Sequence, residues 1–432
     1  MSLLDKIRQH KAHITVIGLG YVGLPLLVEV AKAGFQVTGY DKNYSRVLDV
    51  QRGNSYIRDV SSAELTQLVR SGFVTATAEP DCIAQSDVVI ICVPTPLNKS
   101  RSPDNGYIVA AAEDIIPRMH PQMLLILEST TFPGFTREVL LPRLQDSGFK
   151  AGEDFYLAFS PERVDPGNQR FQTRNTPKVV GGITGNCLEM VRALYSEVME
   201  KLVPVSSTDA AEMVKLLENT FRAVNIGLVN EVAIMCQKLA LDTWEVIDAA
   251  ATKPFGFMPF YPGPGLGGHC IPVDPLYLSW KLRTLKYEAR FIDLADQINT
   301  GMPEVVVSRL QDALNDKMLA VRASRILVIG IAYKRDIDDI RESPALDVIE
   351  LLQQKGANVR YHDPYVPILA LAGHSYASVP LTNLTDYDAV VVLTDHSCID
   401  YKQVVADSVL VLDTRNATRG LQLYSKAKIY RL

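Results

Sequence analysis

The sequence predicts an α/β protein with two doubly wound parallel-sheet domains joined by a helical central region with one long helix. Two patterns indicate this class. Apolar segments of strand length alternate with helical patterns at both ends of the chain. Between them lies helical periodicity, and its longest stretch runs from Thr208 to about Leu241. At 432 residues the chain is long enough for several cores, and we expect domains at residues 1–205, 206–315 and 316–432.

The composition is that of an ordinary globular protein, with 47% hydrophobic and 22% charged residues and a net charge of −5. No run of Lys or Arg is present, which argues against nucleic acid as a partner. The longest apolar runs, such as Val88–Cys92, are too short to span a membrane, and Met1–Lys6 lacks the apolar core of a signal peptide. The six cysteines lack metal-ligand or disulfide-framework spacing. We therefore expect a cytoplasmic protein with reduced thiols, without a metal or a membrane partner.

The N-terminal domain opens with a dinucleotide-binding pattern. A strand at His13–Ile17 runs into the glycine-rich turn Gly18–Gly23, and an apolar helix follows to about Ala33. A second strand, Phe35–Tyr40, ends on Asp41. This order of strand, GxGxxG turn, helix, strand and acid is typical of a Rossmann domain.

Each residue type in that pattern has a physical reason. Gly18 is expected to make the tight turn, Gly20 to let the backbone reach a pyrophosphate, and Gly23 to let the helix pack on the strand. The pyrophosphate would face the N-terminus of the helix. Asp41 would accept hydrogen bonds from the ribose hydroxyls, which favours NAD, although Lys42 and Arg46 leave NADP open.

Three later strands of this domain end in polar segments. Asp87–Val93 is followed by Pro94–Pro96, Leu124–Leu127 by Glu128–Thr131, and Tyr156–Ser160 by Pro161–Gly167. Doubly wound sheets bind ligands at the carboxyl ends of their strands. The three polar ends therefore indicate a site at that edge, although Ser and Thr there also serve as helix caps.

A loop rich in glycine and proline, Tyr261–Pro275, interrupts the helical region. It contains Cys270, with His269 beside it and Asp274 four residues later. A thiol on a backbone that can approach a ligand closely indicates a nucleophile. A small buried hydrophobe is the alternative for any single cysteine.

On the long helix, Lys215 and Asn219 are four residues apart and share one face, so both can point at one site. After that helical region a second strand–helix pattern begins at Arg325–Gly330, with Lys334 just beyond the strand. Further strands are expected at Asn358–Tyr361, Ala389–Leu393 and Val409–Leu412, with a helix at Ala345–Gln354. This second domain is predicted to bind another nucleotide or to cover the site.

In order, and along nearly the whole chain, these motifs resemble the UDP-glucose/GDP-mannose dehydrogenase family. The matching segments are Gly18–Gly23 with Asp41, Val93–Pro96, Glu128–Thr130, Ser160–Glu162, Lys215–Asn219, Gly267–Asp274 and Ala332–Lys334 through Arg341–Ser343. The family uses NAD to oxidise the C6 alcohol of a nucleotide sugar to a carboxylate in a four-electron reaction. The resemblance implies NAD as cofactor, a UDP-sugar as substrate and a homodimer built on the central helices.

The resemblance also assigns roles to residues. The implied catalytic residues are Cys270, which traps the aldehyde, with Lys215, Asn219, Asp274, Glu162 and Thr130. The implied cofactor contacts are Gly18, Gly20, Tyr21, Val22, Gly23, Asp41, Arg46, Thr95, Thr130 and Arg341. The implied substrate contacts are Glu162, Arg163, Lys215, Asn219, Phe260, Tyr261, Gly265, Gly267 and Lys334.

One departure narrows the substrate. The UDP-glucose branch usually reads Pro-Glu-Phe-Leu-x-Glu-Gly, whereas Pro161–Gly167 places Pro166 where the second glutamate stands. This form resembles the branch that acts on UDP-N-acetylhexosamines. Thr252–Gly256 and Gly263–Trp280 resemble the UDP-N-acetylglucosamine 6-dehydrogenases, whose product is a surface-polysaccharide precursor. The mannosamine and galactosamine epimers and UDP-glucose remain open.

Three other classes remain open from the residues alone. A two-electron β-hydroxyacid dehydrogenase also has an NAD domain followed by helices, but it needs no cysteine loop and releases one NADH per turnover. A sensor of a nucleotide sugar or of NAD would not depend on Cys270. A zinc site at His269 and Cys270 is disfavoured, because adjacent ligands without a second cluster make poor tetrahedral geometry.

Overall fold

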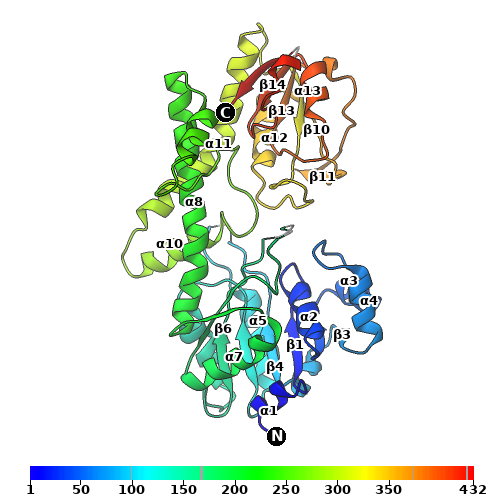
Figure 1. Ribbon diagram of the computed structural model, residues 1–432, viewed down its shortest axis with the longest axis vertical. Helices are drawn as coiled ribbons and strands as arrows, with labels where there is room; N and C mark the ends of the chain where they lie inside the picture. Colours follow the sequence, from blue (N-terminus) through cyan, green and yellow to red (C-terminus); the bar gives the residue numbers. More distant parts are fainter. Residues whose placement is uncertain (99, 166–167, 169, 372, 425–426) are drawn as a thin grey trace. The chain divides into compact units, whose positions relative to one another are not determined.

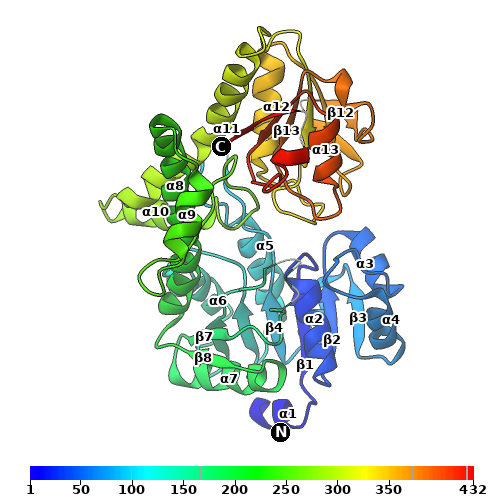
Figure 2. The same ribbon diagram turned by 45° about the horizontal axis from the view of Figure 1, so that its top comes forward.

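The computed structural model describes residues 1–98, 100–165, 168, 170–371, 373–424 and 427–432. They divide into two compact units, residues 1–218 with 276–287 and residues 219–275 with 288–432. Each unit holds one large sheet with helices packed on it, as the ribbon shows (Figures 1 and 2). The predicted α/β class is confirmed.

The first unit is built on an eight-stranded sheet. In spatial order its strands are β3 (Val74–Thr77), β2 (Gln36–Tyr40), β1 (His13–Ile17), β4 (Val88–Ile91), β5 (Leu124–Leu127), β6 (Tyr156–Phe159), β7 (Lys178–Gly182) and β8 (Leu202–Pro204). The sheet is parallel, as predicted, except that β6 and β7 pair antiparallel. The described residues between these two strands form no helix of the kind that joins a parallel pair.

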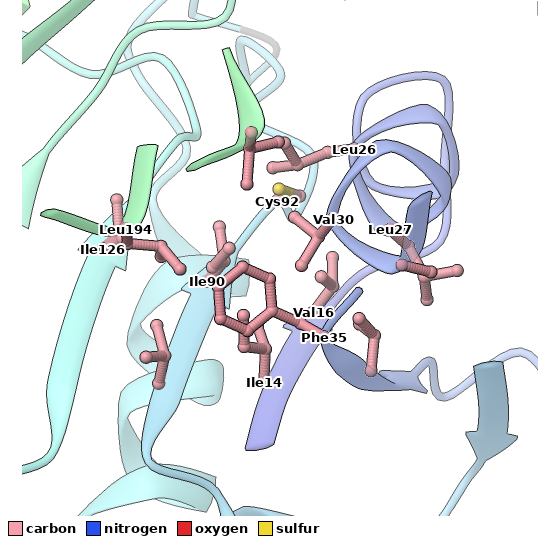
Figure 3. Close-up of a cluster of buried hydrophobic side chains, with 14 of the residues drawn as sticks. Ile14, Val16, Leu26, Leu27, Val30, Phe35, Ile90, Cys92, Ile126 and Leu194 are labelled. Atoms are coloured by element: carbon pink, nitrogen blue, oxygen red, sulfur yellow. The ribbon is translucent and has the colours of Figure 1, made fainter. Parts of the chain in front are cut away.

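Helices cover this sheet on the face that holds the main core. They are α1 (Leu3–Arg8), α2 (Gly23–Lys32) and α7 (Gly185–Val198), while α3 (Tyr44–Gln51), α4 (Ser62–Arg70), α5 (Gly106–Ile115) and α6 (Leu141–Gln145) complete the α-helices of the N-terminal segment. Leu26 and Val30 of α2 and Leu194 of α7 gather around Ile90 and Ile126 of the sheet (Figure 3). Every residue of β4 and β5 is buried, as expected of strands covered on both faces.

The second unit contains a five-stranded, fully parallel sheet. Its order is β10 (Asn358–His362), β9 (Arg325–Ile329), β13 (Ala389–Val392), β14 (Leu410–Asp413) and β15 (Lys428–Arg431). Alternate residues of β9 enter different cores: Val328 packs with α11 (Arg290–Asn315) and α12 (Pro344–Gln354), and Ile329 packs with α13 (Tyr401–Asp407). The sequence did not predict β15, α13 or the hairpin of β11 (Ile368–Leu371) and β12 (His374–Ala377).

The long helix predicted from Thr208 is α8 (Thr208–Leu239), with 32 residues and a length of about 48 Å. It ends two residues before the predicted Leu241, because Ala240 turns to φ 55° and the Leu241 amide bonds back to the Cys236 carbonyl at 2.9 Å. Asp242 then caps the next helix, α9 (Thr243–Ala251), by accepting from two of its backbone amides.

Two further predictions concern a membrane span and the segment after β6. No helix in the described part of the chain is long and apolar enough to cross a membrane. Pro166 and Gly167, on which the prediction of a UDP-N-acetylhexosamine branch depends, lie outside the described residues.

Candidate active site

The glycine-rich turn after β1 has the form that a dinucleotide requires. Gly18 lies at φ 91°, and a Cβ there would come within 2.6 Å of the Cys92 carbonyl oxygen. A Cβ on Gly23 would collide with the carbonyl of Gly18, so the helix starts directly against the turn. A Cβ on Gly20 would meet nothing within 4 Å, so this backbone faces open space. The turn thus leaves room for a ligand only where the pyrophosphate is expected.

The start of α2 also suits an anion. Val22 occupies its N-cap position and provides no side-chain hydrogen bond, so the first amides of the helix have no side-chain cap. Helix amides without a cap, together with the helix dipole, bind phosphate groups well. The neighbouring Tyr21 is exposed. These residues fit the phosphates of NAD.

Asp41, at the end of β2, is tied to the glycine-rich turn. Its Oδ2 accepts from the Leu19 amide at 2.8 Å, and its Oδ1 accepts from the Asn43 amide at 2.8 Å. Arg46 donates to the same carboxylate at 3.4 Å. A carboxylate in this position can accept from a ribose hydroxyl while it holds the turn in place.

Replacing Asp41 by Asn is therefore expected to raise the KM for NAD about tenfold, the size of one lost charged hydrogen bond. The preference for NAD over NADP should fall as well, because a negative charge beside the 2′ position is removed. Steady-state kinetics with each dinucleotide measure both effects. Asp49→Asn, at a half-buried position of α3, is the matched control, and an unchanged KM in Asp41→Asn would contradict the assignment.

The carboxyl ends of β4, β5 and β6 are adjacent, so the predicted polar segments meet at one edge. The half-buried Thr95 and Thr130 follow β4 and β5. The hydroxyl of Ser129 donates to the Val93 carbonyl at 2.8 Å and links the two strand ends. Glu162 follows β6, and its carboxylate accepts from the next two backbone amides at 2.7 and 2.6 Å.

The first half of α8 brings two side chains to this edge. Lys215 is buried and donates to the Glu162 carbonyl at 2.6 Å. Arg163 forms an ion pair with Glu218, one turn further along, and also donates to the Pro177 carbonyl at 2.6 Å. Within the first unit the structure thus brings together Thr130, Glu162, Arg163 and Lys215, as the sequence predicts for one sheet edge.

In the second unit, Asn219 of α8 and Asp274 form a buried pair. The Asn219 amide donates to Asp274 Oδ2 at 2.6 Å. Asp274 is the first residue of α10 (Asp274–Thr284), and its backbone amide donates to the Cys270 carbonyl at 2.8 Å. Cys270 is half-buried, and its Sγ lies 3.4 Å from Nε2 of His269. The thiol therefore sits one helical turn before a fixed carboxylate–amide pair.

The cysteine loop packs on the segment after β9. The Gly268 amide donates to the Arg341 carbonyl at 2.9 Å. A Cβ on Gly267 would collide with Tyr333, and one on Gly268 would lie 2.9 Å from the Tyr333 ring. A Cβ on Gly265, at φ 136°, would lie 3.0 Å from the Asn299 carbonyl oxygen and from Pro344. Only glycine allows this loop to approach the second sheet so closely.

The remaining predicted site residues belong to the second unit. Lys334 is half-buried beside Tyr333, and the Arg341 guanidinium forms an ion pair with Asp339 at 2.6 Å. Tyr261 stacks on Trp244 and donates to Asp248 at 2.9 Å, while the ring of Phe260 contacts Phe221 with centroids 5.8 Å apart. The substrate roles of Lys334, Phe260 and Tyr261 and the cofactor role of Arg341 stay predictions.

Arg415 was missed by the sequence reasoning. It follows β14, is half-buried, lies against Gly263 and donates to the Leu393 carbonyl at 3.0 Å. Burial lowers the pKa of Arg415 to about 10. The strand-end rule used for the first domain would have found it, because Asp413-Thr414-Arg415 is the polar end of a predicted strand.

In the described part of the chain, no group of three His, Cys, Asp or Glu residues is placed to hold a metal ion. A dinucleotide-binding sheet and a thiol on a glycine loop define a nicotinamide-dependent oxidoreductase. The chain belongs to the UDP-glucose/GDP-mannose dehydrogenase family. It matches that family's NAD binding domain at residues 12–199, its central domain at 209–301 and its UDP binding domain at 327–420. The protein is thus an NAD-dependent enzyme of nucleotide-sugar oxidation.

Its relatives carry different substrate names. UDP-N-acetyl-D-glucosamine 6-dehydrogenase of Pseudomonas aeruginosa is 35% identical over 92% of this chain and 93% of its own. UDP-N-acetyl-D-mannosamine dehydrogenase of Salmonella typhi is also 35% identical, over 94% of this chain and 99% of its own. The structure of UDP-D-ManNAc dehydrogenase from Pyrococcus horikoshii aligns with a TM-score of 0.89 at 31% identity, over 97% of this chain and 98% of that one.

Proposed function

We propose that the protein oxidises C6 of UDP-N-acetyl-D-glucosamine to give UDP-N-acetyl-D-glucosaminuronate, a precursor of surface polysaccharide, with Cys270 as a covalent nucleophile. The observation that carries this proposal is the buried Asn219–Asp274 pair, tied through the Asp274 amide to the Cys270 carbonyl. A carboxylate held by an amide one turn from a thiol can position water or a hydroxyl group at that thiol. We retain the division at residues 1–205, 206–315 and 316–432 as part of the proposal.

The chemistry follows from the side chains. NAD, held by the glycine-rich turn and Asp41, supplies the hydride acceptor for both oxidations. In the first, the C6 hydroxyl loses its proton to neutral Lys215 or to a water held by Asn219 and Asp274. The Cys270 thiolate then adds to the aldehyde carbon, and a cationic Lys215 stabilises the resulting oxyanion.

Loss of the second hydride from this thiohemiacetal leaves a thioester on Cys270. Water, activated by Glu162 or Asp274, attacks the thioester carbonyl, and the C–S bond breaks to release the acid and the thiolate. Because the thiol must stay reduced between turnovers, we place the enzyme in the reducing cytoplasm. Thr130 contacts the reacting end of the substrate in this scheme.

The second unit offers cations for a diphosphate. Lys334 and Arg335 follow β9 and Arg415 follows β14, all at the carboxyl edge of the parallel sheet. Arg415 lies against the backbone of the cysteine loop at Gly263. Charged groups at this edge support binding of a UDP moiety by the second sheet.

UDP-N-acetyl-D-mannosamine is the second candidate substrate, favoured by the names of the Salmonella and Pyrococcus relatives. The deciding experiment supplies each of UDP-N-acetylglucosamine, UDP-N-acetylmannosamine, UDP-N-acetylgalactosamine and UDP-glucose as the limiting reagent with excess NAD. We expect two NADH per mole of UDP-N-acetylglucosamine and at least tenfold lower kcat/KM for the others. Two NADH from another sugar would correct the substrate, and a yield of one would contradict the four-electron reaction.

We also propose a homodimer formed through α8. Four exposed apolar side chains, Phe221, Leu228, Met235 and Leu239, follow each other at intervals of seven, seven and four residues. This spacing puts them along one side of the helix. Phe291 and Leu294 of α11 add further exposed apolar surface, and a stripe of this kind is typical of an interface between subunits.

Leu228→Glu is therefore expected to convert the protein from a dimer into a species of 47.8 kDa, because the interface cannot desolvate a carboxylate. Sedimentation velocity measures the mass. Leu423→Glu, at an even more exposed leucine of the second unit, is the control and should leave the mass unchanged. Wild-type protein that sediments with the mass of one chain would refute the dimer.

A further inference from the structure

A buried carboxylate on α8, that of Glu212, takes no part in the chemistry proposed above. Glu212 is fully buried and lies three residues before Lys215. Its Oε1 accepts from the Thr136 amide at 2.9 Å, from the Thr136 hydroxyl at 2.6 Å and from the Thr131 hydroxyl at 3.4 Å. Its Oε2 accepts from the Gly134 amide at 2.6 Å. One side chain thus fastens four donors of a single segment to the helix.

A charge is costly at this position. Burial raises the pKa of Glu212 to about 7, and the hydrogen bonds from Thr136 and Gly134 offset only part of that effect. A glutamine of nearly the same shape would avoid the charge. It would, however, offer one acceptor oxygen and turn an NH2 group toward donors. The arrangement therefore requires two acceptor oxygens, which only a carboxylate provides.

The fastened segment carries a predicted site residue. Thr130 lies between Ser129, whose hydroxyl bonds to the Val93 carbonyl at 2.8 Å, and Thr131, which bonds to Glu212. On its other side the segment packs through Phe132 on Trp280 of α10, with ring centroids 5.1 Å apart. Thr130 is thus anchored on one side to the end of β4 and on the other to α8.

We propose that Glu212 is a positioning residue, which fixes the register between the Thr130 segment and the turn of α8 that carries Lys215. The reacting end of the substrate would then be aligned between these two side chains. This inference rests on the proposed function, in which Thr130 and Lys215 contact the substrate. Small displacements of such groups lower the rate of a reaction more than they weaken binding.

The test compares Glu212→Gln and the milder Thr136→Val in the full-length enzyme. Thr136→Val keeps the backbone hydrogen bond and removes only the hydroxyl. The matched control is Thr15→Val in β1. It removes a buried hydroxyl that is hydrogen-bonded at 2.6 Å to Ser86, two residues before β4. Thermal unfolding, kcat and the KM values for NAD and for the UDP-sugar are measured for each protein.

We expect Glu212→Gln to lower kcat about 100-fold and Thr136→Val about fivefold, with the KM for NAD within a factor of two. The double variant Glu212→Gln/Thr136→Val should be no slower than Glu212→Gln, because both substitutions disrupt the same attachment of the segment to α8. Thr15→Val should lower the Tm as Thr136→Val does while keeping kcat. If Glu212→Gln does not fold, Thr136→Val decides the question.

Equal kcat values for Thr136→Val, Thr15→Val and the wild type would overturn the inference and leave Glu212 a purely structural residue. That result is distinct from a failure of the proposed function, which the wild type alone reveals. A wild type that oxidises a different UDP-sugar leaves the inference testable with that sugar. A wild type that oxidises none of them overturns both proposals.

Discussion

Replacing Cys270 by Ala is expected to lower the rate of carboxylate formation by at least about 1000-fold. Without the thiol no thiohemiacetal forms, so the carbon that should lose the second hydride is no longer held covalently in the site. The NADH yield should fall from two to at most one per mole of UDP-sugar, with the aldehyde or its hydrate as the only product. NADH absorbance with a limiting substrate, together with mass spectrometry of the product, measures both.

The control for this experiment lies in the same chain. Cys398 is an exposed free cysteine in the second unit, and Cys398→Ala should keep the wild-type rate and yield. A Cys270→Ala protein that still releases two NADH would disprove the thioester route. A variant that binds NAD normally but releases no NADH would show that Cys270 is needed before the first oxidation.

Gly268→Ala is expected to cause the second largest loss, about 100-fold in kcat, although the new methyl group is small. Gly268 has φ 82°, and its Cβ would lie 2.9 Å from the ring of Tyr333. The positive φ alone costs a non-glycine residue about 1 kcal/mol. Relief of the steric conflict must move either the ring or the loop, and the loop carries Cys270 two residues later.

Two further variants separate these causes. Gly72→Ala has a similar φ of 78° with no atom within 4 Å of the Cβ, so it should lower stability by about 1 kcal/mol and leave kcat unchanged. Adding Tyr333→Ala to Gly268→Ala removes the ring and should restore part of the rate, measured against Tyr333→Ala alone. A kcat for Gly268→Ala within twofold of the wild type would show that the loop tolerates displacement.

Features encoded by short-range patterns were predictable. The glycine spacing after β1 predicted the tight turn, because Gly18 adopts a φ that other residues rarely take. Helical periodicity placed Lys215 and Asn219 one turn apart on α8, and the structure has both buried on that helix. The rule that parallel strands end at one edge brought Thr130 and Glu162 to the same sheet edge.

Other features depend on contacts between segments far apart in the sequence. Strand β7 pairs antiparallel with β6, and no local pattern in Lys178–Gly182 distinguishes this direction from a parallel one. Strand β15 was missed because only pairing with β14 gives Lys428–Arg431 its structure. Its residues are polar or half-exposed, so they lack the apolar run of a central strand.

The α/β class, the dinucleotide turn and the residue types of a thiol-based oxidation are predictable from the sequence, because each depends on local patterns and spacings. How these groups are held depends on tertiary contacts. In the sequence, Glu212 is one of several polar residues on a long helix. Its hydrogen bonds come from the segment Thr131–Thr136, which is distant in the sequence. The lowered pKa of Arg415 arises because its guanidinium is desolvated and lies against the backbone of Gly263. Both depend on desolvation and on hydrogen-bond partners from distant segments, and neither is encoded in a local pattern.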